Sequence, residues 1–182
     1  FGLIWDTELA EWKPADGYCD CPVVNVSWYG AKAFADCVGG ALPTEAQWEF
    51  ACRGGLEETP FGLGNGLDLT GDIAHIRATD RKTTAPVGSY SPNGFDLYDL
   101  HGNVSEWVAD WFDANYYGGS GGFAWNPTGP ETGTGKVVRG GDFTMDKLSC
   151  RCAARAYCSP PGDKYADRIP CGFRPGYEMG MI

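Results

Sequence analysis

Long apolar runs, basic residues and histidine are all scarce in this sequence, and each shortage argues against a class of protein. No stretch approaches the roughly 18 consecutive apolar residues that a membrane-spanning helix needs, and Phe1 begins no recognisable signal sequence. The 14 basic and 24 acidic residues give a net charge of -10, which repels polyanions such as nucleic acids. Neither histidine, His75 or His101, lies beside a serine or cysteine nucleophile, so structural roles are favoured over a catalytic triad.

The composition predicts one domain that spans residues 1–182. With 43% hydrophobic and 14% aromatic residues, a chain of this length can build a single sizeable core. The 27 glycines are about twice the average usage and are spread along the chain, which is typical of a domain rich in turns. The sequence shows no internal repeat, low-complexity tract or interdomain linker.

Eight cysteines lie towards the two ends of the chain, and the centre has none. An even number of cysteines in a loop-rich acidic domain favours disulfides and an oxidising compartment. The alternative is a four-thiolate zinc site made by the two Cys-x-Cys pairs, although structural zinc sites usually space each ligand pair by two or more residues. The cysteines are Cys19, Cys21, Cys37, Cys52, Cys150, Cys152, Cys158 and Cys171.

Two short helices are predicted early in the chain. Ser27 is suited to cap a helix from about Trp28 to Val38, which Gly39 and Gly40 would end. Trp28, Ala31, Ala35 and Val38 are expected to fall on one face of this helix. In "LPTEAQWEFACRGG", Thr44 and Gln47 form a capping box, and two glycines again supply the stop.

The rest of the chain is expected to be loops and short strands. Residues 56–94 carry turn signals, and a short strand is predicted at Lys136–Arg139. Four tryptophans are expected in the core: Trp28, Trp48, Trp107 and Trp111. Four other aromatic residues are expected in a loop, where they could stack on a ligand: Tyr116, Tyr117, Phe123 and Trp125. Arg139 and Arg174 are expected to brace the fold by pairing with carboxylates such as Glu45 or Glu49.

Five phrases, taken in order, resemble the formylglycine-generating enzyme or sulfatase-modifying factor family. They are "VSWYGAKAFADC", "ALPTEAQWEFACRGG", "TAPVGSYSPNGFDLYDLHGNVSEW", "VVRGGDF" and "CGFRP", and they extend from about Val23 to Pro175. The resemblance implies an irregular α+β domain of the C-type-lectin-like kind, with short strands and many loops. It also implies that part of the usual N-terminal segment is absent, cleaved or supplied by another chain.

The resemblance also bears on catalysis. The generating enzymes oxidise a sulfatase cysteine with a copper ion held by two cysteines that follow the paired glycines. Met145 stands at the first of these positions and Cys150 at the second, in a segment that is shorter than in the enzymes. Because a thioether in place of a thiolate weakens a copper(I) site, the oxidase is only the alternative function.

Further sites are implied by the same resemblance. Cys52 would pair with Cys152, and Cys37 with Cys171 or a near neighbour. A structural calcium ion would be held by the side chains of Asp99 and Glu106 and the carbonyls of Gly102 and Val104. A second calcium site is expected to be missing, because His75 replaces its asparagine ligand and histidine is a poor calcium ligand.

The shortened final segment resembles the variable proteins of diversity-generating retroelements, which display ligand-contacting residues on this scaffold. The exposed residues between Thr144 and Arg168 would then form a binding face for a protein or glycan. The candidate contact residues are Thr144, Asp146, Tyr157, Lys164, Tyr165 and Asp167.

The function predicted from these features is non-catalytic. The chain is expected to be a disulfide-stapled, calcium-containing ligand-binding or surface-display domain, located outside the cell or on a cell or virion surface. One alternative is the copper-dependent oxidase. Another is a structural subunit of an extracellular homo-oligomer or assembly, in which neighbouring copies cover an edge left open at the N-terminal end.

Overall fold

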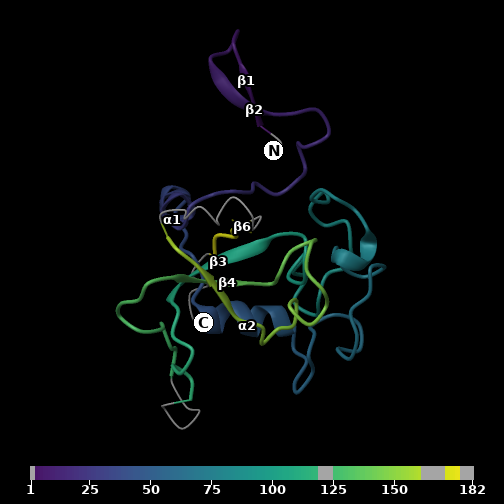
Figure 1. Cartoon of the computed structure of the whole chain (residues 1–182), viewed down its shortest axis with the longest axis vertical. Helices are drawn as coiled ribbons and strands as arrows, with labels where there is room; N and C mark the ends of the chain where they lie inside the picture. Colours follow the sequence, from purple (N-terminus) through teal and green to yellow (C-terminus); the bar gives the residue numbers. More distant parts are fainter. Residues whose placement is uncertain (1–2, 119–124, 161–170, 177–182) are drawn as a thin grey trace.

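The structure is a computed structural model that describes residues 3–118, 125–160 and 171–176. Short strands and two helices are joined by long irregular segments, so the α+β, loop-rich fold class expected from the sequence is confirmed (Figure 1). The elements are β1 (Leu3–Asp6), β2 (Glu11–Pro14), α1 (Trp28–Cys37), α2 (Glu45–Arg53), the 3-10 turn η1 (Arg77–Thr79), β3 (Ser105–Trp111), β4 (Lys136–Arg139), β5 (Ala156–Cys158) and β6 (Cys171–Gly172).

Four strands form the central sheet in the order β5-β4-β3-β6. The β3–β4 and β4–β5 pairs are antiparallel, whereas β6 runs parallel to β3. Trp107 in β3 lies opposite Val138 in β4, and the register shifts before Trp111. The strand predicted at Lys136–Arg139 is confirmed as β4.

The two helices cover opposite faces of this sheet. Trp28, Ala31 and Ala35 of α1 pack with Trp107 and Val138 in one buried cluster. The other cluster joins Trp48 and Cys52 of α2 to Val108 and Val137, whose side chains point the other way because strand residues alternate between faces. Figure 1 shows the sheet between the two helices.

The local signals for both helices are confirmed. The Ser27 hydroxyl accepts a hydrogen bond from the Gly30 amide, and the Thr44–Gln47 capping box is complete. Gly54 ends α2 in a left-handed conformation, with φ of 57°. Val38 lies just beyond the last turn of α1 and is 39% exposed, so it does not share the buried positions of Trp28, Ala31 and Ala35.

Strand β3 is the main element that sequence patterning did not identify. Its first four residues are all buried, because one face meets α1 and the other meets α2. A strand buried on both faces shows no polar–apolar alternation, which is the usual sequence signal for a strand. Trp28, Trp48 and Trp107 are core residues as expected, while Trp111 is half-buried near the end of β3.

The hairpin formed by β1 and β2 stands away from the rest of the molecule (Figure 1). The segment after it returns to the body, where the Val87 amide donates a hydrogen bond to the Asp20 carbonyl. Among the described residues, no helix is long and apolar enough to cross a membrane, in agreement with the expectation from the sequence.

Candidate functional site

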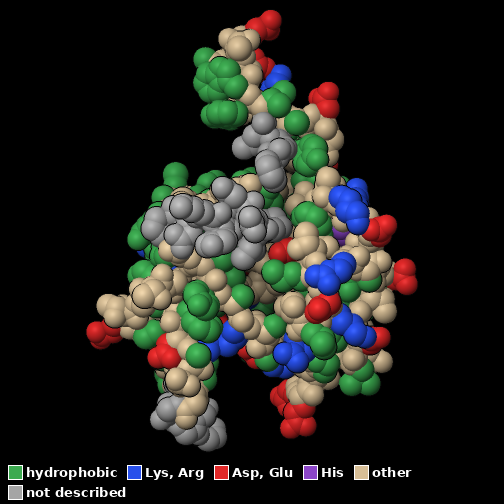
Figure 2. Space-filling model, viewed as in Figure 1, with side chains coloured by type: hydrophobic (Ala, Val, Ile, Leu, Met, Phe, Trp, Pro, Cys, Tyr) green, Lys and Arg blue, Asp and Glu red, His purple; other side chains and the backbone are tan. Residues whose placement is uncertain are grey.

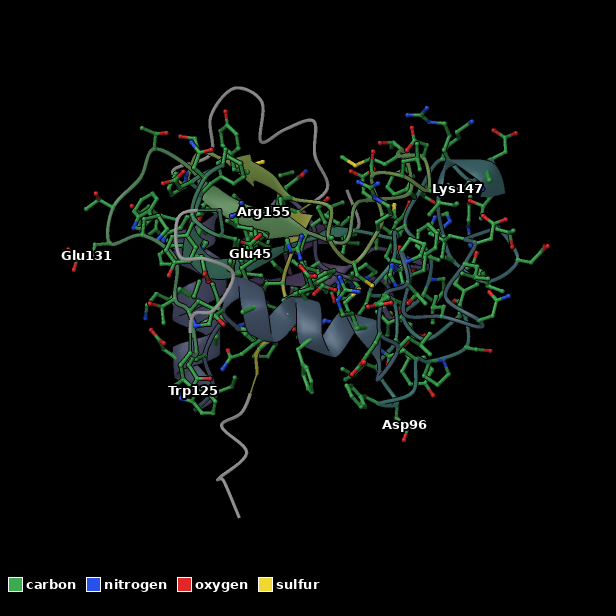
Figure 3. The ribbon with its side chains drawn as sticks, turned by 90° about the horizontal axis from the view of Figure 1, so that it is seen from below. Glu45, Asp96, Trp125, Glu131, Lys147 and Arg155 are labelled. Carbon is green, nitrogen blue, oxygen red and sulfur yellow. The ribbon has the colours of Figure 1, made fainter. Side chains whose placement is uncertain are left out.

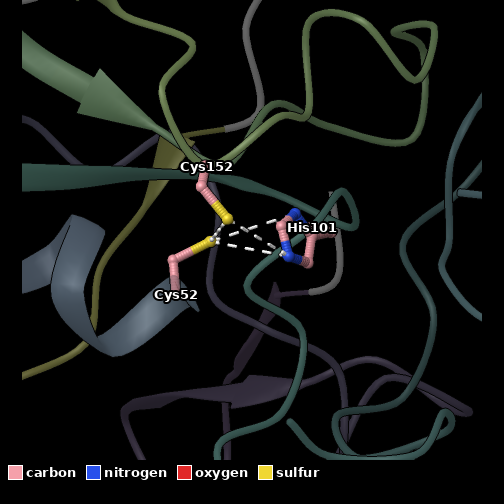
Figure 4. A group of neighbouring side chains, drawn as sticks. All are labelled: Cys52, His101 and Cys152. Carbon is pink, nitrogen blue, oxygen red and sulfur yellow. Dashed lines mark hydrogen bonds between the residues drawn. The ribbon is translucent and has the colours of Figure 1, made fainter. Parts of the chain in front are cut away.

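Two cysteines that lie 100 positions apart meet in the interior. Cys52 is in the last turn of α2 and Cys152 follows the paired glycines, and both side chains are fully buried (Figure 4). Their sulfur atoms are 3.5 Å apart, a non-bonded contact rather than the roughly 2.05 Å of a disulfide. The structure therefore brings together the two thiols that the resemblance paired.

His101 borders this pair, and its hydrogen bonds define its tautomer. Its Nδ1 lies 2.7 Å from the Cys150 carbonyl oxygen, which only accepts, so the ring proton is on Nδ1. Its Nε2 then accepts a hydrogen bond of 2.9 Å from the Gly62 amide. Both ring nitrogens therefore have backbone partners, which supports the expected structural role of this histidine.

Cys52, His101 and Cys152 have the side-chain chemistry of a metal site, and their ligand atoms lie within 4.8 Å of one another. Nε2 lies 3.5 Å from the Cys52 sulfur and 4.0 Å from the Cys152 sulfur. A metal ion would need the Nε2 lone pair that already accepts the Gly62 amide, and would leave that amide unpaired. The arrangement fits a disulfide between the cysteines better than a three-ligand metal site.

Hydrogen bonding within the pair makes the two thiols unequal. Cys52 donates a hydrogen bond to the Cys152 sulfur, and this bond lowers the pKa of Cys152. Burial raises the pKa of Cys52.

The other cysteines lie in different surroundings. Burial raises the pKa of Cys150, whose side chain packs with Phe61 and Ile76, a cluster separate from that of Cys152. The two sulfurs thus do not share one cluster, which disfavours the alternative four-thiolate zinc site. Cys37 is exposed at the end of α1, while Cys171 is buried with its thiol hydrogen-bonded to Cys158, so the Cys37–Cys171 pairing stays a prediction.

The two positions that correspond to the copper ligands also lie together. The Met145 side chain packs against the same apolar cluster that contains the fully buried Cys150. Gly141, with φ of 68°, lies against the Cys150 sulfur so closely that a Cβ there would be 2.6 Å from it. Burial raises the pKa of Cys150 to about 12, and the Asp142 and Asp146 charges act in the same direction, so this sulfur stays a protonated thiol at neutral pH.

The carboxylates predicted to hold calcium are already engaged. The Glu106 side chain is buried in β3, and Arg174 donates to both of its oxygens, from Nε at 2.7 Å and from Nη2 at 2.5 Å. The Trp48 indole donates a third hydrogen bond, of 2.8 Å. One oxygen of Asp99 accepts the Gly88 amide at 2.7 Å.

A calcium ion would have to share Glu106 with the guanidinium of Arg174, so the donor set in this arrangement does not fit the ion. Burial also raises the pKa of Asp99. The calcium ion, with the Gly102 and Val104 carbonyls as its other ligands, stays a prediction.

His75, which the resemblance places at a second calcium site, is buried and makes contacts within the chain. The ring is 1% exposed and stacks on Phe143 with centroids 5.5 Å apart. Its Nε2 donates to the Thr83 carbonyl at 2.8 Å, and its Nδ1 lies 2.9 Å from the Thr79 hydroxyl. Both ring nitrogens thus have partners in the segment that follows His75.

The predicted ligand face is described only in part, because Lys164, Tyr165 and Asp167 lie outside the described residues. The Thr144 hydroxyl donates to Asp142, and Asp146 accepts hydrogen bonds from Ser149, so both side chains stabilise a turn. Tyr157 on β5 is 56% exposed and is therefore available to a ligand.

Tyr157 belongs to a continuous stack of side chains, which we term the aromatic strip: Tyr157, Phe112, Arg155, Tyr117 and Tyr116. Tyr157 stacks on Phe112 at 4.5 Å, and the Arg155 guanidinium lies 5.0 Å from the ring centres of both Phe112 and Tyr117. The ring of Tyr116 meets Tyr117 edge to face. The strip joins β5 to the aromatic loop that follows β3.

A buried carboxylate fixes the middle of the strip. Arg155 donates to both oxygens of Glu45, at 2.7 and 2.8 Å, so the two lie side by side in Figure 3. Arg139, fully buried, approaches Glu45 at 3.5 Å and also pairs with Glu49. The predicted bracing role of Arg139 is confirmed, whereas Arg174 braces the fold through Glu106 rather than through a residue of α2.

The fold is that of a small C-type-lectin-like α+β domain, which contains a buried sulfur pair and presents an aromatic strip. A family model described as "Sulfatase-modifying factor enzyme 1-like domain" matches residues 2–175. The chain belongs to this family, as the sequence phrases indicated.

Relatives within the family differ in what their names say. The formylglycine-generating enzyme of Thermomonospora curvata is 42% identical, with an alignment that covers 84% of this chain and 54% of the enzyme. A Bos taurus protein named inactive C-alpha-formylglycine-generating enzyme 2 is 34% identical over 88% of this chain and 62% of its own length. This chain thus spans about half of the curated enzyme.

Among solved structures, Treponema denticola variable protein 1 superposes with a TM-score of 0.74 and 26% identity. The match covers 88% of this chain and 73% of the variable protein. The similarity to a variable protein that the final segment suggested is therefore found in the fold as well.

Proposed function

We propose that this chain is a non-catalytic ligand-binding or surface-display domain, stapled by a Cys52–Cys152 disulfide and located in an oxidising compartment. The observation that carries the proposal is the Met145 and Cys150 pair. A thioether and a buried thiol whose pKa is raised to about 12 stand where the generating enzymes need two accessible thiolates. Relatives named as inactive and as a variable protein support the same conclusion.

The aromatic strip is the ligand face in this proposal. Its rings hold one another and Arg155 is held by Glu45, so a ligand would bind without ordering long flexible side chains. The ion pair balances the Arg155 charge, which leaves an aromatic surface suited to the apolar faces of a glycan or to a protein segment. A glycan array with the wild-type chain and Tyr157→Ala tests this face, because loss of binding in the variant is expected.

The copper-dependent oxidase is the second candidate, because the T. curvata enzyme is 42% identical and Cys150 keeps one of the two sulfur positions. The test incubates the chain with copper(I), oxygen and a peptide that carries the sulfatase cysteine motif, and follows conversion of cysteine to formylglycine by mass spectrometry. We expect no conversion and no tight copper(I) binding by the wild-type chain.

Two variants make this test decisive. Met145→Cys restores the thiol at the first ligand position and should increase copper(I) affinity relative to the wild type, which shows that the assay detects such a site. Oxidation by the wild-type chain that disappears in Cys150→Ser would refute the non-catalytic proposal.

A further inference from the structure

The N-terminal hairpin carries a disproportionate share of the negative charge. The hairpin, residues 3–14, contains three acidic residues and one basic residue, so its net charge is 1 - 3 = -2 out of -10 for the whole chain. The acidic residues are Asp6, Glu8 and Glu11. Because the hairpin projects from the body, this charge is presented to solvent (Figure 1).

The two faces of the hairpin differ in chemistry. Trp5 lies opposite Trp12, with ring centres 5.5 Å apart in an edge-to-face contact, and the two side chains are 49% and 65% exposed. Asp6, Glu11 and Lys13 lie on the other face, where Lys13 pairs with Asp6 at 2.5 Å. Figure 2 shows hydrophobic side chains gathered on one side of the projecting hairpin.

Such a hairpin is an unusual feature for an isolated chain. A two-stranded hairpin without further packing is marginal in water, and exposed tryptophans are the residues that most often dominate binding interfaces. Contact between two copies would bring together two hairpins of net charge -2 on chains of net charge -10, which opposes self-association. The hairpin is a single layer, so the carboxylates on its other face still make the potential at the tryptophan face more negative, an effect that physiological salt screens over about 8 Å.

We propose that the Trp5–Trp12 face is a docking surface for a basic, extended segment of a partner protein. Arginine or lysine side chains would lie over the tryptophan rings, the best cation–π acceptors among the aromatic residues. The carboxylates of the hairpin would attract the segment and increase its association rate. This site is independent of the aromatic strip and of the proposed function.

The test uses the full chain and a labelled peptide that alternates arginine and valine, with binding measured by fluorescence anisotropy. We expect binding that weakens steeply between 50 and 300 mM salt, roughly as charge screening requires. Combined Trp5→Ala and Trp12→Ala substitution should weaken binding at least about tenfold, the effect typical of removing interface hot spots. Trp125→Ala is the matched control, because Trp125 is 93% exposed elsewhere on the surface and should leave binding unchanged.

A second variant preserves the tryptophans, so the test does not depend on the hairpin surviving their removal. Glu8→Gln with Glu11→Gln should weaken binding at low salt and match the wild type at high salt. Equal binding by the double alanine variant, salt-independent binding, or equal binding of a glutamate–valine peptide would overturn the proposal. Dimerisation that the tryptophan substitutions abolish, or binding to phosphatidylcholine vesicles, would overturn it in favour of another occupant.

Discussion

Replacing Asp110 by asparagine is expected to stabilise the protein at neutral pH. Asp110 in β3 is 1% exposed, and its Oδ2 accepts the amide of Glu45, the first residue of α2, at 2.7 Å. Its Oδ1 is buried and has no partner among the described residues, and a Cβ on Gly129 would lie 3.0 Å from it. Asparagine keeps an acceptor for the Glu45 amide but carries no charge.

The magnitude follows from the ionisation of the buried group. Burial, together with the charge of Glu45, raises the pKa of Asp110 from 3.8 to about 6. A carboxyl whose pKa is raised on folding favours the folded state fully below pH 3.8, and that contribution is lost as the pH rises through about 6. At about 1.36 kcal/mol for each pKa unit, the ionised form costs about 3 kcal/mol at pH 7.

Two smaller effects oppose the gain from the substitution. The negative charge of Asp110 at the N-terminus of α2 contributes about 0.3–1 kcal/mol. The new amide N–H needs a partner and costs about 1 kcal/mol if it finds none. Tyr117 is a candidate partner, because its hydroxyl is buried without one and the Asp110 charge helps to raise the pKa of Tyr117. The burial cost dominates, so we expect a net stabilisation of about 1–2 kcal/mol at pH 7.

Urea unfolding at pH 7 and pH 4.5 measures the effect. The advantage of Asp110→Asn over the wild type should shrink at the lower pH, where the native Asp110 is protonated. Asp113→Asn is the matched control, because Asp113 is exposed on the same segment and its substitution should change stability little. A destabilised Asp110→Asn protein at pH 7, or a difference that does not change with pH, would refute the reasoning and show that the charge itself is needed.

Three further predictions concern cysteines and calcium. Non-reducing peptide mapping should find a Cys52–Cys152 disulfide, and two free thiols would contradict the pairing. Because the disulfide closes so long a loop, replacing both cysteines by serine should lower the free energy of unfolding by about 4 kcal/mol. Because burial raises the pKa of Cys150 to about 12, native protein at pH 8 should resist alkylation there until it is unfolded, and rapid labelling would show the thiol to be accessible. Calcium should shift the melting temperature by less than about 2 °C because Arg174 occupies Glu106, whereas a larger shift that EDTA reverses would establish the predicted calcium site.

The sequence by itself determined the local features that depend on neighbouring residues. The caps at Ser27 and Thr44, the glycine at the end of α2 and the strand at Lys136–Arg139 could each be located without the fold, because capping and turn formation involve residues only a few positions apart. The family and its fold class were also apparent, because they rest on several phrases in a fixed order.

Only the tertiary structure decided what the buried side chains do. The contact between Cys52 and Cys152 could be expected only from the family resemblance, because the two residues lie 100 positions apart. Arg174 reaches Glu106 across 68 positions, so no local pattern could rank this partner above others. His101 is a structural residue rather than a metal ligand because the Gly62 amide approaches its free nitrogen, a contact that depends on loop packing. The hydrogen-bonding capacity of each buried group is a property of its residue type, but the partner that uses this capacity is set by the long-range packing of the chain.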